Sequence, residues 1–340
     1  MTPILALLIV IWAVVVIHEL GHFWAARLAG AKATVFSIGF GRPIIKWHDR
    51  HGTEWRIAWL QFGGFVAIYG QDDMFDRKKF DAYSKKKKEG HYLSLPAWKQ
   101  AMIIAAGVFM NFILAWVIYT GLNIGTQTVQ LPVAGIVSEG SAIKTGDRIL
   151  QINGAKIHSW DDLLIEKTLA GGKESNLLIL RGEKLVRVKM GGGLWGVSPD
   201  ANKTEVVDRG LFGAILKGAA EVWTQSKMMM TVLGQIISGD RSARQLGGII
   251  HIADVSGKAL AAGFVALMSM IALISVNLGI INLFPLPVLD GGYLLILLIE
   301  AAARRKMRGK TMAWIMRIGW WFLCALIAFT VWNDMTRILA

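Results

Sequence analysis

The chain has 340 residues, of which 54% are hydrophobic and only 18% are charged. This balance excludes a typical soluble enzyme and favours an integral membrane protein. The formal net charge of +13 suits either nucleic acid or an anionic membrane surface as a partner. The single cysteine, Cys324, excludes an internal disulfide and a cysteine-rich zinc site, so a metal would need His, Asp or Glu ligands.

Residues 1–30 contain the first long apolar segment, with no charge from Pro3 to Ile17. A helix of this length reaches about 39 Å, enough to cross a bilayer. A cleaved signal peptide fits poorly, because no basic residue precedes the run and it continues into His-Glu-Leu-Gly-His. We therefore predict a first transmembrane helix that carries this motif.

Three further apolar segments, at residues 97–121, 258–284 and 312–334, are predicted to span the membrane. Twelve Lys and Arg lie between residues 30 and 96, and five more lie in the loop at residues 303–311. Four spans put both loops on one side, which the positive-inside tendency makes cytoplasmic. No nucleic-acid partner is expected, because the Lys85–Lys88 run lacks interleaved aromatic residues.

The cytoplasmic loop at residues 31–96 begins with a β-rich stretch, residues 32–69, followed by a Lys-rich segment. Its hairpins are either ordinary cytoplasmic hairpins or dip toward the membrane core, where a polar backbone must line a protein cavity. Gly63 and Gly64 would allow a close approach of the backbone.

Between the second and third spans, residues 131–190 alternate short β-like runs with turns. Asn153-Gly154 and Arg181-Gly182 predict turns, and Ser159 is placed to cap a helix beginning at Trp160. The phrases GDRILQING and SWDDL resemble a PDZ domain of the bacterial type, which implies peptide binding by strand addition. A spacer without a ligand is an equal alternative. Residues 200–257 predict amphipathic helices or a linker on the outer membrane surface.

His18-Glu19-Leu20-Gly21-His22 has the pattern H-E-x-x-H. On a helix, positions four apart share one face, so both imidazoles can converge on one zinc ion while Glu19 acts as general base on a water. The alternative is a pair of helix histidines satisfied by neighbours. Ionisable residues inside a membrane span are costly and usually functional, which favours the metal.

A catalytic zinc needs a third protein ligand, and the segment at residues 285–311 offers one. Pro285 and Pro287 break the third span, and Asp290 is the only carboxylate in that break. Broken helices at membrane depth are tolerated only against a protein cavity, which indicates a site. The alternative is a capping Asp where the helix leaves the membrane.

HELGH together with NLFPLPVLDGG resembles the site-2 proteases, which are intramembrane zinc metalloproteases, over nearly the whole chain. The bacterial regulator-of-sigma-E protease branch, with its PDZ insertion, is the nearest likeness. The resemblance implies His18, His22 and Asp290 as Zn²⁺ ligands and Glu19 as the catalytic base. It also implies substrate-handling positions, which are Asn277, Asn282, Pro285, Pro287, Gly63 and Gly64.

The same resemblance implies a polytopic α-helical membrane protein with four transmembrane helices, a cytoplasmic-side membrane-reentrant β-hairpin region and a periplasmic PDZ insert of α+β type. It would lie in the bacterial inner membrane with both termini on the periplasmic side. The implied substrates are transmembrane-helix proteins, such as an anti-sigma factor, and remnant signal peptides. AGVFMNFILA matches the family's second-span signature around Asn111.

The chain also departs from this family. It has one PDZ-like unit where relatives often have two, and Gly248 and Tyr293 stand where relatives usually have Pro and His. Two other functions remain open from the residues: a zinc transporter or sensor, and a membrane scaffold that binds through its PDZ-like unit.

Overall fold

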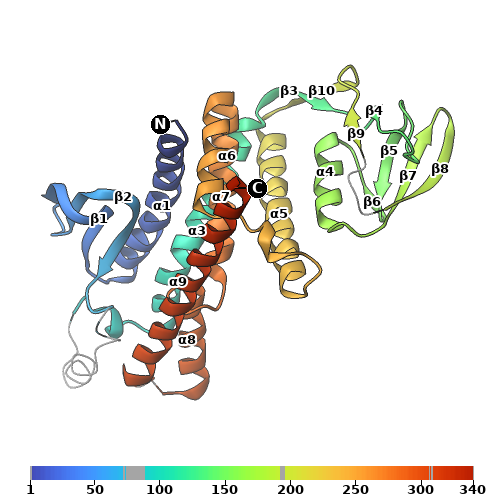
Figure 1. Cartoon of the computed structure of the whole chain (residues 1–340). Helices are drawn as coiled ribbons and strands as arrows, with labels where there is room; N and C mark the ends of the chain where they lie inside the picture. Colours follow the sequence, from blue (N-terminus) through green and yellow to red (C-terminus); the bar gives the residue numbers. More distant parts are fainter. Residues whose placement is uncertain are drawn as a thin grey trace. The chain divides into compact units, whose positions relative to one another are not determined.

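The computed structural model describes residues 2–71, 73, 89–191, 196–305, 307 and 309–339, so the Lys85–Lys88 run lies outside the described residues. The chain divides into two compact units. The first unit comprises Met1–Ile118 and Leu246–Ala340, and the second comprises Tyr119–Gln245. Figure 1 shows the elements of each unit, coloured along the chain.

In the described part of the chain, four helices are long and apolar enough to cross a membrane, which confirms the predicted number of spans. They are α1 (Thr2–Ala29), α3 (Ala97–Leu122), α7 (Phe264–Leu283) and α9 (Gly309–Leu339). Large apolar side chains on α9, including Trp320 and Trp321, are exposed, as expected for a surface that contacts lipid.

The third span is shorter than the predicted segment 258–284. α6 (Ile249–Ala262) ends at Gly263, whose φ of +107° interrupts the helix, and α7 begins at the next residue. At the other end α7 stops at Leu283, because the prolines that follow cannot continue a helix. α8 (Asp290–Ala303) then occupies much of the segment predicted as a loop, and α9 extends beyond the predicted 312–334.

The predicted hairpin region folds as two long antiparallel strands, β1 (Ala33–His48) and β2 (Glu54–Ile68). Both strands bend, so that Phe36 of β1 has Cα partners in two parts of β2, at Val66 and Trp55. Phe36 and Trp55 also contact Phe23 of α1, with ring centroids 5.6 and 5.1 Å away. These aromatic contacts hold the strands beside α1 (Figure 1).

Two apolar clusters join the helices of the first unit. One contains Val10 and Val14 of α1 with Met270 and Ile271 of α7, and partly buried residues of α6 pack against it. The other joins the end of α1 to α3, α8 and the short 3-10 helix η2 (Tyr92–Ser94). The clusters bring the start of α8 and the second half of α1 into one unit.

The second unit is built from a four-stranded sheet of order β6-β5-β7-β8 and two strand pairs, β4-β9 and β3-β10. Buried Ile149, Ile152, Leu177 and Ile179 pack against α4 (Trp160–Leu169). The strands are β3 (Gly125–Gln130), β4 (Ala134–Val137), β5 (Arg148–Ile152), β6 (Ala155–Lys156), β7 (Ser175–Arg181), β8 (Lys184–Met190), β9 (Val197–Pro199) and β10 (Thr204–Arg209). Helix α5 (Leu211–Ile237) and the 3-10 helix η3 (Ala243–Gln245) follow.

The local signals read from the sequence of this unit are confirmed. Asn153 and Gly154 have φ of +48° and +89° between β5 and β6, and Gly182 turns the chain between β7 and β8. Ser159 caps α4 through a reciprocal capping box with Asp162. β9 pairs with β4, so the folded unit extends beyond the predicted end at residue 190.

Candidate metal centre

The H-E-x-x-H motif lies in the second half of α1, which packs closely against α3. A Cβ on Gly21 would lie only 2.4 Å from the carbonyl oxygen of Ala106, so glycine is required at this point of the motif. Because His18 and His22 are one turn apart, their imidazoles leave α1 on the same side, and their Nε2 atoms lie 3.2 Å from each other.

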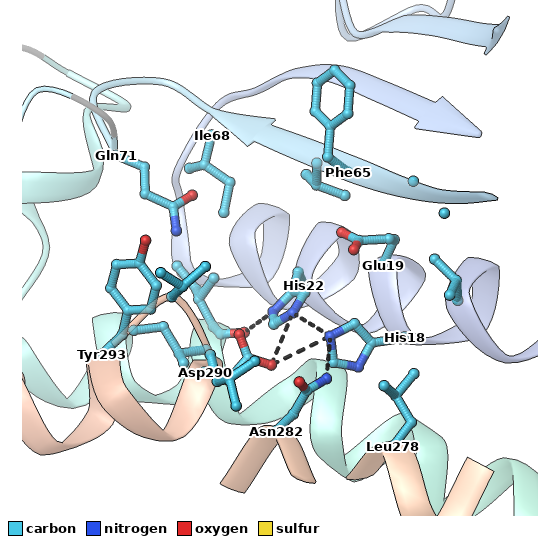
Figure 2. A pocket seen from close by; sticks show the side chains of 18 of the residues that line it. His18, Glu19, His22, Phe65, Ile68, Gln71, Leu278, Asn282, Asp290 and Tyr293 are labelled. Carbon is cyan, nitrogen blue, oxygen red and sulfur yellow. Dashed lines mark hydrogen bonds and ion pairs between the residues drawn. The ribbon is translucent and has the colours of Figure 1, made fainter. Parts of the chain in front are cut away.

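Asp290 completes the cluster as the first residue of α8. Its Oδ2 lies 3.3 Å from Nε2 of His18 and 3.4 Å from Nε2 of His22 (Figure 2). The chain reaches this point because Val288 adopts a left-handed φ of +84°, which turns the segment between α7 and α8. Three ligand-type atoms from distant parts of the sequence therefore face one another.

The three atoms fit a zinc ion. Ligand atoms about 2.0–2.2 Å from a tetrahedral zinc lie roughly 3.3–3.5 Å apart, which matches the separations observed here. Asp290 Oδ2 is buried and accepts no well-formed hydrogen bond from the residues that the structure describes. A buried carboxylate oxygen that faces two imidazole nitrogens is best satisfied by a cation between them.

His22 is oriented by α3. Its Nδ1 lies 2.8 Å from the carbonyl oxygen of Ile103, which can only accept a hydrogen bond. Nδ1 therefore carries the hydrogen, and the lone pair of Nε2 is left facing Asp290. This is the arrangement that a metal-binding histidine needs.

Glu19 lines the same cavity, on the β2 side of α1 (Figure 2). A Cβ on Gly64 would lie 3.6 Å from the Cγ of Glu19 and only 2.7 Å from the carbonyl oxygen of Ser37. Glycine at position 64 thus lets β2 approach β1 closely at Ser37, at a point beside Glu19. Glu19 is placed beside the three ligand-type atoms rather than among them.

The cavity has a volume of about 460 Å³ and is walled by α1, β2, α3, α7 and α8. Of the predicted substrate-handling positions, Gly63, Gly64 and Asn282 line it, and Asn282 Nδ2 lies 3.4 Å from His18 Nε2. The structure does not bring the other predicted positions, which are Asn277, Pro285 and Pro287, to the wall of this cavity. Pro287 instead packs against Gly319 of α9, where a Cβ would lie 2.4 Å from its ring.

Several residues of the site were not predicted from the sequence. Gln71, Tyr293 and Phe40 line the cavity, and Gly107 lies against both imidazoles. A Cβ on Gly107 would lie 2.3 Å from Nε2 of His22 and 2.9 Å from Cε1 of His18. The signal available in the sequence is a glycine in the middle of the apolar second span, four residues before an asparagine.

Comparison with known proteins agrees with this geometry. The profile described as Peptidase family M50 matches residues 6–326. A protein of Campylobacter jejuni is 36% identical over 98% of this chain and 94% of its own length. "Metalloprotease MmpA" of Caulobacter vibrioides is 32% identical over 98% of this chain and 95% of its own length. "Zinc metalloprotease RasP" of Bacillus licheniformis is 29% identical over 99% of this chain and its full length.

The described residues include four candidate membrane spans, and the family match covers nearly the whole chain. This membrane protein therefore belongs to peptidase family M50, the site-2 proteases, and is a zinc metalloprotease.

Proposed function

We propose that this protein hydrolyses peptide bonds inside transmembrane segments of other membrane proteins, with His18, His22 and Asp290 holding the zinc ion and Glu19 acting as general base. The observation that carries the proposal is the triangle of ligand atoms, 3.2–3.4 Å apart, which joins the membrane-spanning helix α1 to α8 beside the Glu19 carboxylate. Zinc, when bound, lowers the pKa of the attacking water toward neutrality.

The residues of the chain divide the remaining work. Glu19 takes a proton from water while the water oxygen attacks the scissile carbonyl carbon. It then gives the proton to the leaving amine nitrogen as the C–N bond breaks. Asn282, whose Nδ2 lies 3.4 Å from Nε2 of His18, donates from its amide to the oxygen on which charge develops. The two carboxylates have separate roles because only Asp290 faces both imidazoles.

The substrate is an extended segment held along β2. Peptide bonds in a helix are shielded by hydrogen bonds, so a transmembrane helix must unwind locally before attack. Gly63, Gly64, Phe65, Val66 and Ile68 of β2 line the cavity, which supports backbone pairing of the unwound segment with this strand. We infer a membrane-reentrant position for β1 and β2, supported by exposed apolar side chains such as Ile44, Trp59 and Leu60.

The segment at residues 131–190 serves as a PDZ-type insert on the periplasmic side. This assignment is supported by its α+β composition, its capped helix α4 and the sequence phrases that resemble PDZ domains. It binds trimmed substrate ends or filters substrates by size. The basic loops support an orientation with both termini in the periplasm and the protein in the bacterial inner membrane. Anti-sigma factors and remnant signal peptides are the proposed substrates.

Glu19→Gln tests this function. The variant should keep its zinc and lose at least about 100-fold of its cleavage rate on a transmembrane substrate in detergent, because a general base typically contributes 10²–10⁴-fold. Glu205→Gln, at an exposed glutamate outside residues 131–190, is the matched control and should keep full activity. His18→Ala should lose zinc.

Other functions predict different results. A zinc transporter would keep its flux in Glu19→Gln, and a scaffold would lose its function only when residues 131–190 are deleted. Full cleavage by Glu19→Gln would contradict the proposed mechanism.

A further inference from the structure

Three residues of α3, each one turn from the next, lie against the two imidazoles. The carbonyl oxygen of Ile103 lies 2.8 Å from His22 Nδ1, and Gly107 leaves room for both rings. Asn111 lies at the other end of this row, with its Nδ2 3.2 Å from His18 Nδ1. One face of α3 thus contacts both rings, and it meets their Nδ1 atoms at Ile103 and Asn111.

His18 needs a hydrogen-bond acceptor at the position of Asn111. Its Nε2 faces Asp290 at 3.3 Å, so metal binding uses the Nε2 lone pair and leaves the hydrogen on Nδ1. An amide nitrogen can only donate, and two donors cannot bond each other. The asparagine oxygen, Oδ1, is buried and receives no hydrogen bond from any described residue. A 180° rotation of the amide places this oxygen opposite Nδ1–H and satisfies both groups.

The asparagine is held where this bond can form. Asn111 is fully buried, and Ser275 Oγ of α7 donates to its backbone carbonyl over 2.8 Å. A Cβ on Gly279 would lie 3.5 Å from the Cβ of Asn111, so α7 covers the side chain closely. The side chain is therefore shielded from solvent, and Nδ1 of His18 lies within hydrogen-bonding distance of its amide.

We propose that Asn111 is a positioning residue of the metal centre. Its side-chain oxygen accepts a hydrogen bond from Nδ1–H of His18, in the same way that the carbonyl oxygen of Ile103 accepts one from Nδ1–H of His22. The bond selects the tautomer of His18 and orients its ring, so both histidines present Nε2 to the metal. The inference rests on the proposed role of His18 and His22 as zinc ligands. Loss of such an outer hydrogen bond typically weakens metal affinity ten- to a hundredfold.

The experiment compares zinc affinities of the full-length protein in detergent, measured by competition with a chelator. Asn111→Leu keeps a similar volume without an acceptor and should bind zinc ten- to a hundredfold more weakly. Asn111→Asp keeps an acceptor in the same place and should retain zinc affinity within a few-fold. Asn123→Leu removes another buried asparagine, which follows the last residue of α3 and donates to Glu221 over 3.2 Å, and should leave zinc affinity unchanged.

Cobalt substitution provides a second readout, because its visible absorption reports the geometry of the ligands. The spectrum should change in Asn111→Leu and remain close to that of the parent protein in Asn111→Asp. A purely structural asparagine would lower the thermal stability of the zinc-free protein without changing either the affinity or the cobalt spectrum.

Unchanged zinc affinity in folded Asn111→Leu would overturn the inference. An Asn111→Asp variant that binds zinc more than tenfold more weakly than the parent would also overturn it. If the Asn111→Leu variant does not fold, the zinc affinity of Asn111→Asp alone tests the inference. Zinc retained by both His18→Ala and His22→Ala would instead refute the proposed ligand set. Zinc lost in these variants but unaffected in Asn111→Leu would refute only the role of Asn111.

Discussion

Glycine at position 107 gives the two imidazoles the room they need. In the middle of a helix, glycine costs about 1 kcal/mol relative to alanine. Glycine is nevertheless needed at this position, because any side chain would overlap the ring of His22. A Cβ on residue 107 alone would lie 2.3 Å from Nε2 of that ring. The two histidines are therefore positioned by the helix beneath them as well as by their own spacing.

Gly107→Ala should lose most of its bound zinc and at least about tenfold of its activity, although alanine favours the helix. Gly121→Ala is a matched control on the same helix, because a Cβ at that position meets nothing within 4 Å. The control should keep zinc and activity. Metal analysis of the purified proteins measures the difference, and equal zinc content in the two variants would disprove the steric argument.

A second buried carboxylate, Asp147 of the second unit, shows how charge is stabilised outside the membrane spans. Arg181 donates to both of its oxygens, over 2.9 and 2.7 Å, and the backbone N–H of Lys144 donates over 2.7 Å. Burial alone would raise the pKa of Asp147, but these hydrogen bonds outweigh it and the pKa lies below the usual value of 3.8.

The free energy of unfolding of the second unit should therefore fall as the pH is lowered. A carboxyl group whose pKa is depressed by folding contributes its full stability above pH 3.8 and loses it as the pH falls through the lower folded value. Asp147→Asn should be less stable than the parent at pH 7 and should lose less stability on acidification. Hydrogen exchange of β5 and β7 in the full-length protein, normalised for intrinsic rates, measures this, and parallel pH profiles would contradict the prediction.

At the scale of elements, the break between α7 and α8 brings Asp290, the third proposed ligand, to the two histidines. α8 starts so close to the end of α7 that a Cβ on Gly291 would lie 2.2 Å from the carbonyl oxygen of Leu283. A Cβ on Gly292 would lie equally close to the carbonyl oxygen of Leu286. The double glycine therefore lets the first turn of α8 fold back, which places Asp290 opposite the histidines.

Gly291→Ala should displace the start of α8 and weaken zinc binding by at least about tenfold, since ligand geometry and metal affinity are coupled. Gly234→Ala, in α5, meets nothing within 4 Å and serves as the control for a glycine-to-alanine change in a helix. Zinc affinity and helix content by circular dichroism are measured together. A Gly291→Ala protein with parental zinc affinity would show that α8 does not depend on this close approach.

At the scale of the molecule, the proposed zinc site ties together helices of the first unit only. The proposed ligands come from α1 and α8, and the histidines rest on α3, whereas the second unit has its own core around Ile149 and Leu177. Zinc binding should therefore stabilise one unit and leave the other almost unchanged.

Removing zinc with a chelator should speed hydrogen exchange in α1 and α8 and leave β5 to β8 unaffected. A ligand present at a hundred times its dissociation constant stabilises the state that binds it by about 2.7 kcal/mol, which sets the scale of the effect. Hydrogen exchange of the full-length protein with and without chelator tests this. Equal changes in both units would mean that they unfold together.

Much of the fold and half of the candidate site could be predicted from local patterns. Runs of apolar residues predicted the four spans, and the turn at Asn153-Gly154 and the cap at Ser159 follow from local chemistry. The start of the third span was placed too early, because the apolar pattern continues unbroken through Gly263 while the backbone does not. Asn277 and Asn282 look equivalent in sequence, but only Asn282 lines the cavity.

The sequence by itself determined the chemistry: two histidines and a glutamate on one apolar span, and an aspartate in the proline-enforced break that follows another span. Only the tertiary structure decided that these groups meet, with ligand atoms 3.2–3.4 Å apart, and that α3 supports them through Ile103, Gly107 and Asn111. The physical reason is that helical periodicity places residues four apart on one face, whereas contacts between helices depend on packing over the whole unit.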